Sequence, residues 1–142
     1  MENSNMALKG DKTETKPFTI LVVDDEEYIL AFIGIRLKVS GYQVLTAADG
    51  IQALEVIRNR VPDLVVIDLI MPHMDGPTLL KEIRKFSSVP VIILSSIESH
   101  DVIVRELLGG VDDYIHKPFN LDELVARIEA VRRRQQNSGS TV

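Results

Sequence analysis

Short apolar runs alternate along the chain with stretches whose apolar positions recur at helical spacing. The run 20–23 is followed by segment 29–37, in which apolar residues lie three or four positions apart. This spacing puts side chains on one face of a helix. Gly41 then follows the last apolar position, and a glycine placed there is typical of a helix end. The beginning of the chain therefore predicts a strand and then an amphipathic helix.

Two later runs are apolar at every position and rich in β-branched residues. They are 64–67 and 91–94. Strands that are covered by helices on both faces have this composition, so both runs predict central parallel strands. Another strand is expected at 43–47, and a shorter one around 114–115.

Helical patterns separate and follow these strands. Asp49 and Gln52 are spaced as in a capping box and predict where the second helix begins. Three further helices are expected: one with a stripe of Leu79, Leu80, Ile83 and Phe86, one at Ser99–Leu108, and a last one that holds the i, i+3, i+4, i+7 pattern from Leu121 to Val131. Five βα units predict an α/β fold: a doubly wound, five-stranded parallel sheet in the flavodoxin-like order 2-1-3-4-5, with five helices.

Both ends of the chain lack this patterning. Residues 1–16 are polar without periodic apolar positions and predict a disordered leader, and the Gln, Asn, Ser and Gly residues of 135–142 predict a flexible tail. Between them lies one domain, residues 17–134, which is within the usual size of a single domain.

Composition excludes several classes of protein. A net charge of -5 disfavours direct binding of this domain to nucleic acid, which needs clustered positive charge. No apolar stretch approaches the roughly 18 residues of a membrane span, and the polar N-terminus is unlike a secretory signal. We therefore expect a cytoplasmic protein that does not bind membranes. The absence of cysteine excludes disulfides and thiolate sites.

Polar residues follow the apolar runs at four of the predicted strand ends. They are Asp24 and Asp25 after the first strand, Asp68 after the third, Ser95 after the fourth and Lys117 after the fifth. Ligands bind beyond the carboxyl ends of the strands in such sheets, so these side chains should share one rim. Three carboxylates brought together repel one another unless a multivalent cation compensates. Oxygen donors without His or Cys favour magnesium.

Each of these residues alone has an ordinary structural explanation. Adjacent acids after a strand commonly cap a helix or lie in a solvated turn, and a lysine before proline is usually a surface charge. Only their joint placement at successive strand ends favours a site. The three histidines, at 73, 100 and 116, lack metal-ligand spacing, so a zinc site is not expected.

Four separated motifs, in this order, resemble the receiver domains of response regulators, the CheY-like family. They are the segments 20–26, 68–76, 94–96 and 113–119. The stretch 123–128 and the arginines at 132–134 are most similar to receivers of the OmpR/PhoB type.

The resemblance implies a phosphoacceptor switch of two-component signal transduction, which takes a phosphoryl group from a sensor histidine kinase with magnesium as cofactor. It implies no turnover of an external substrate, and hence no enzyme in the usual sense. The implied roles are phosphorylation at Asp68, magnesium binding by Asp24, Asp25, Asp68 and the Ile70 carbonyl, phosphoryl contacts by Ser95 and Lys117, and switching by Ser95 and Tyr114.

The resemblance also implies an output. Phosphorylation would remodel the face of the fourth helix, fifth strand and fifth helix, and promote a homodimer there through Arg127 and Asp112 or Asp113. Transcription would then be controlled through a DNA-binding domain absent from this sequence. Glu129 departs from the OmpR/PhoB pattern, in which a basic residue is common, and Ser95 stands where threonine is commoner.

Two other classes of function stay open. A magnesium-dependent phosphatase of related topology would use Asp68 as a transient nucleophile and turn over phosphate esters, whereas a receiver forms a stoichiometric acyl phosphate. A scaffold whose phosphorylation no longer matters would lack site residues, and none is missing here.

Overall fold

Five apolar segments pair as one parallel sheet in the computed structural model, which describes residues 17–71, 73–96 and 110–140. The strands are β2 (Thr19–Val23), β3 (Gln43–Ala47), β4 (Leu64–Asp68), β5 (Val91–Ser95) and β6 (Asp113–His116). Their order is β3-β2-β4-β5-β6, which confirms the predicted 2-1-3-4-5 arrangement. β2, β4 and β5 are buried at every position, because helices cover both faces of the sheet.

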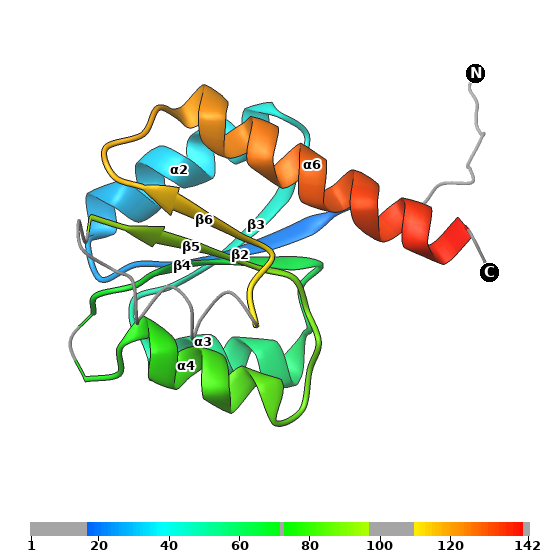
Figure 1. Ribbon diagram of the computed structural model, residues 1–142. Coiled ribbons are helices and arrows are strands. Elements are labelled where there is room, and N and C mark those ends of the chain that lie inside the picture. The colour runs from blue at the N-terminus through cyan, green and yellow to red at the C-terminus, as the bar shows by residue number, and fades with distance from the viewer. Residues whose placement is uncertain (1–16, 72, 97–109, 141–142) are drawn as a thin grey trace, which may run out of the picture.

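Helices form a layer on each face of this sheet (Figure 1). The described part of the chain contains α2 (Glu27–Val39), α3 (Gly50–Asn59), α4 (Gly76–Arg84) and α6 (Leu121–Ser140). α2 and α6 bury their apolar stripes in one core cluster, and α3 and α4 bury theirs in a second cluster on the opposite face. The predicted helix at 99–108 and the predicted leader, 1–16, lie outside the described residues.

Local side-chain contacts explain where two of the helices begin. The carboxylate of Asp49 accepts from the Gln52 amide at 2.8 Å, and the Gln52 side chain accepts from the Ala48 amide at 2.9 Å. These bonds confirm the predicted start of α3 as a variant of the capping box, in which Gln52 reaches the amide one residue before the N-cap Asp49. Asp75 caps α4 in a similar way by accepting from the Thr78 amide at 2.9 Å.

The last helix is longer than the sequence pattern predicted. α6 continues through Ser140, so residues 135–140, which the sequence pattern placed in a flexible tail, are helical. Arginine and glutamine are good helix formers, and each residue added to an existing helix gains a backbone hydrogen bond. Phe86 also differs from expectation: it lies beyond the end of α4 and is 43% exposed.

α2 is apolar on two sides. Leu30, Ile33 and Leu37 face the core, while four large apolar side chains, each at least 60% exposed, follow one another along the outer side: Tyr28, Phe32, Ile35 and Val39. Among the described helices none combines the length and the apolar character that crossing a membrane requires.

Candidate functional site

The register of the sheet brings the predicted site residues to one level. The last paired residues of β2 and β4 are Val23 and Ile67. Asp24 and Asp68 come directly after them and therefore lie side by side. Asp68 is in turn paired with Leu94, the residue before Ser95. Lys117 follows β6, next to the end of β5. Because the apolar strands end at the same level, these polar residues lie together at the carboxyl edge of the sheet.

Three carboxylates meet at this edge. One oxygen each of Asp24, Asp25 and Asp68 lies within 4.8 Å of the other two. Asp24 and Asp68 are buried, with 1% and 7% exposure, while Asp25 is exposed. We call these three residues the acid rim. Its donors are all oxygens, which suits a hard divalent cation.

Asp24 is held by the fold through only one of its oxygens. Its Oδ1 accepts from the Glu26 amide at 2.9 Å, whereas Oδ2 is buried and has no hydrogen-bond partner within the described part of the chain. Burial raises the pKa of Asp24 from 3.8 to about 6; the Glu26 amide opposes this shift, and the Asp68 charge adds to it. A cation next to Oδ2 would supply the missing partner, so the rim fits a bound metal ion.

Asp68 has a cation on one side and acids on the other. The Lys117 ammonium donates to Asp68 Oδ1 at 3.1 Å. Burial raises the pKa of Asp68, while Lys117, and to a smaller extent the backbone amide of Ile70, lower it. The outcome is a carboxylate that is largely removed from water and lies next to one positive charge.

The loop after β4 closes tightly behind Asp68. The Gly76 amide donates to the Leu69 carbonyl at 2.8 Å, and a Cβ on Gly76 would lie 2.9 Å from Leu69 Cα. Only glycine permits this approach. Gly76 therefore shapes the loop. The side chain of Ile70 in the same loop is 60% exposed, and Pro72 lies outside the described residues.

Ser95 and Lys117 are joined through the backbone. The Lys117 amide donates to the Ser95 carbonyl at 2.6 Å, and the following peptide, Lys117–Pro118, is cis. Ser95 is 1% exposed at the end of β5. A cavity of about 430 Å³, which the sequence did not predict, opens beside Lys117 between α2 and the segment after β6, with Phe32 and Phe119 among its lining residues.

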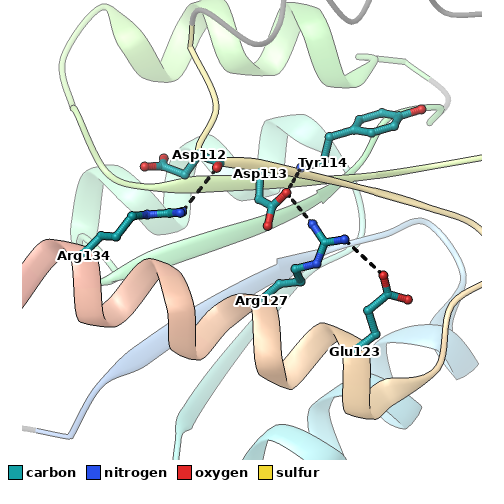
Figure 2. A network of polar contacts seen from close by, with 6 residues as sticks. All are labelled: Asp112, Asp113, Tyr114, Glu123, Arg127 and Arg134. Atoms are coloured by element: carbon teal, nitrogen blue, oxygen red, sulfur yellow. Dashed lines mark hydrogen bonds and ion pairs between the residues drawn. The ribbon is translucent and has the colours of Figure 1, made fainter.

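Tyr114, the predicted switch residue, packs on the sheet face covered by α3 and α4. Its partly buried ring contacts the core cluster of that face. Figure 2 shows the ring directed away from Asp113 and Arg127.

Arg127, predicted to take part in a dimer, is paired within its own chain. Its guanidinium lies 2.8 Å from the Asp113 carboxylate and 3.3 Å from that of Glu123 (Figure 2). The Asp112 carboxylate instead accepts from the Val91 amide at 2.9 Å, so Asp113 is the acid that pairs with Arg127.

Glu129, which departs from the OmpR/PhoB pattern, lies on a different side of α6 from Arg127. Two helical positions correspond to a rotation of about 200°, so Glu129 lies almost opposite Arg127. It accepts a hydrogen bond from the Tyr42 hydroxyl, 87 residues earlier in the chain. Glu129 is therefore separate from the Arg127 face, and nothing in the local sequence pattern indicated its partner.

Comparisons with known proteins agree with this geometry. Among curated proteins, the chain is 45% identical over 121 residues to the probable transcriptional regulator ycf27 of Porphyridium aerugineum, which covers 85% of this chain and 50% of that protein. It is 44% identical to the transcriptional regulatory protein KdpE of Mycobacterium tuberculosis, over 81% of this chain and 51% of KdpE. The chain thus spans about half the length of these curated relatives.

Solved structures match nearly over their full length. The receiver domain of the Francisella response regulator 1452 has 40% identity and a TM-score of 0.77, and covers 84% of this chain and 99% of its own. A CheY-like receiver domain protein of Methanospirillum hungatei JF-1 has 31% identity and a TM-score of 0.80, over 87% of this chain and 99% of its own. The family model of the response regulator receiver domain matches residues 20–129. The chain belongs to this family and is a receiver domain of two-component signal transduction.

Proposed function

We propose that this receiver is a magnesium-dependent phosphoacceptor switch in which Asp68 takes the phosphoryl group. One observation carries the proposal: the buried Asp68 carboxylate lies 3.1 Å from the Lys117 ammonium and within 4.8 Å of the two other acids of the rim. No other carboxylate in the described residues combines a lysine with such a cluster.

The metal would be held by the acid rim. Asp25 and Asp68 would bind it directly together with the Ile70 carbonyl, and Asp24 would act from the outer shell. Bound magnesium supplies positive charge to phosphoryl oxygens during transfer. The partnerless Oδ2 of Asp24 and the purely oxygen donor set support this assignment.

Phosphoryl transfer needs little more from the chain than position and charge. A bond forms between a carboxylate oxygen of Asp68 and phosphorus, the bond from phosphorus to the imidazole nitrogen of a kinase phosphohistidine breaks, and that nitrogen keeps the electron pair. Lys117 would hold one phosphoryl oxygen and the Ser95 hydroxyl would donate to another. Charge spread over these oxygens in the transition state is stabilised by such fixed donors.

A switch and a phosphatase would use the same residues but differ in their products. We propose that the acyl phosphate accumulates to one equivalent and that no external ester is turned over. The test incubates the protein with magnesium and acetyl phosphate and follows mass. One added phosphoryl group is expected, and Asp68→Asn should remove it completely.

Asp63→Asn is the matched control, because Asp63 lies at the opposite end of the sheet and should keep normal labelling. Normal labelling of Asp68→Asn would refute the assignment. Sustained hydrolysis of p-nitrophenyl phosphate with magnesium would favour the phosphatase instead.

The output would follow from movement of Ser95 and Tyr114. When the Ser95 hydroxyl turns to the phosphoryl group, Tyr114 would change its packing and remodel the face made by β6, α6 and the predicted helix at 99–108. Phosphorylation need only shift an existing equilibrium between two states.

A homodimer through this face would use Arg127 and Asp113. Because the two are already paired within one chain, dimerisation must exchange that partner for one in the second copy. Sedimentation with and without beryllofluoride and magnesium tests this idea. An unchanged sedimentation coefficient would count against it.

The wider setting is proposed by likeness to relatives of which the chain spans about half the length. A sensor histidine kinase would be the donor, and the output would be transcription, exerted through a DNA-binding domain of a longer protein. The receiver itself would contact neither nucleic acid nor membrane and would act in the cytoplasm.

A further inference from the structure

At the end of the sheet opposite the acid rim, two aromatic rings meet two charged residues of α6. The rings of Phe18 and Tyr42 pack edge to face with centroids 5.7 Å apart. The Arg132 guanidinium lies 5.2 Å from the Phe18 ring centre and 5.9 Å from that of Tyr42. The Tyr42 hydroxyl donates to the Glu129 carboxylate. The residues directly before β2 and β3 are therefore joined to the last helix at one place.

The surroundings make these contacts stronger than ordinary surface pairs. Tyr42 is 5% exposed, and burial followed by the Glu129 hydrogen bond raises the pKa of its hydroxyl to about 12. Hydrogen bonds and cation–π contacts are worth more where water is excluded. Removing one partner would leave a buried polar group unsatisfied, which costs more than the contact itself contributes.

Beyond these contacts, α6 leaves the body of the domain. Val131 is the last α6 residue buried in the core, and the side chains from Arg133 to Asn137 are exposed. Figure 1 shows the C-terminal part of α6 extending past the ends of the strands. In this part of α6, the Arg134 guanidinium donates to the Asp112 carbonyl at 3.4 Å, a long bond at an exposed side chain (Figure 2). A short helical segment with few contacts to the domain has little to hold it in one direction. The direction of residues 133–140 should thus depend mainly on the contacts that fix the helix just before them.

We propose that Phe18, Tyr42, Glu129 and Arg132 form a clamp that fixes the direction in which residues 133–140 leave the domain. Glu129 and Arg132 lie on adjacent turns, so the clamp holds the last packed turn of α6 at two points. On the other side of the helix, Arg127 pairs with Asp113 of β6. With both sides held, the projecting segment should behave as a rigid extension of the domain.

The chain has no cysteine, so two introduced cysteines can be spin-labelled cleanly. We choose Glu55→Cys on α3 and Gln136→Cys on α6, because both side chains are exposed. Double electron–electron resonance then gives the distribution of distances between the labels. A narrow distribution is expected with the clamp intact. Tyr42→Phe, which removes only the hydroxyl, should broaden it, and Arg132→Ala should do the same.

Tyr28→Phe is the matched control, because this tyrosine lies on α2 and is 67% exposed. It should leave the distribution unchanged. Asp63→Asn serves as a second control, because it weakens the bond to the Thr19 amide at the same end of the sheet without involving α6, and it should leave the distribution narrow. Unchanged distance distributions in both clamp variants would overturn the proposal. So would an equal broadening in Asp63→Asn, because any loss of stability at this end of the sheet would then have the same effect as removing the clamp. Phosphorylation at Asp68 is not needed for either result.

Discussion

The carboxylates at the two ends of the parallel sheet have opposite surroundings. At the amino end, Asp63 accepts from the Thr19 amide at 2.7 Å and Glu129 accepts from Tyr42. At the carboxyl end, Asp24 and Asp68 are buried beside each other, and Asp24 Oδ2 has no partner among the described atoms. Carboxylates at one end complete the fold, whereas at the other they are left in need of a ligand.

The carboxylates at the amino end therefore contribute to stability, and those at the carboxyl end to function. Bonded carboxylates favour the folded state, while clustered and buried ones disfavour it until a cation binds. A ligand that binds only the folded protein then adds stability. The acid rim is therefore expected to weaken the isolated domain and to make its stability depend on magnesium.

In the comparison of the two ends, the largest expected effect comes from removing the Lys117 ammonium beside the acid rim. Lys117→Ala should slow acyl phosphate formation from acetyl phosphate by roughly a hundredfold, because one fixed donor to a developing charge typically contributes this much. The rate is measured by mass spectrometry at saturating magnesium. Arg60→Ala is the control at the other end of the sheet, where Arg60 donates to Gln43, and it should keep the normal rate. Equal rates for the two variants would mean that the cation beside the acid rim contributes no more to phosphorylation than one at the amino end.

A smaller effect of the opposite sign is expected for the rim acids on stability. Asp24→Asn should raise the free energy of unfolding at pH 7 without magnesium by about 1–3 kcal/mol, because a buried charge is removed from the acid rim. Urea titration measures the change, and magnesium should stabilise the variant less than the parent.

Asp63→Asn is the counterpart at the amino end. It should lower stability by about 1 kcal/mol, since a charged hydrogen-bond acceptor is weakened. Destabilisation of the Asp24 variant by a similar amount would mean that the rim supports the fold after all.

The sequence predicted those features that follow from periodicity and strand ends. Uninterrupted apolar runs such as 64–67 marked the buried strands, and one polar residue after each run located Asp24, Asp68, Ser95 and Lys117 at a common edge. The rule worked because parallel strands of similar length end together.

Contacts between side chains of different elements were not predictable in this way. Nothing in the local pattern around Tyr42 indicates a bond to a residue 87 positions away. The choice between Asp112 and Asp113 likewise depended on the register of β6, which puts one carboxylate on the Val91 amide and the other on Arg127. The length of α6 was missed because its extension has no apolar stripe, and hence no period to detect.

The smallest expected effect concerns pH at the amino end. The pKa of Tyr42 is raised to about 12 in the folded protein, whereas an unfolded tyrosine ionises near 10. The contribution of Tyr42 is complete below pH 10 and is lost between pH 10 and 12, because only the unfolded chain ionises there at first. By pH 11 the parent should have lost about 1 kcal/mol more than Tyr42→Phe, in which no hydroxyl is left to ionise. Paired urea titrations of parent and variant at pH 9 and 11 measure the difference. Parallel losses in the two proteins would mean that Tyr42 titrates as it does in water, and the amino end would then lack the strongly bonded interior that distinguishes it from the acid rim.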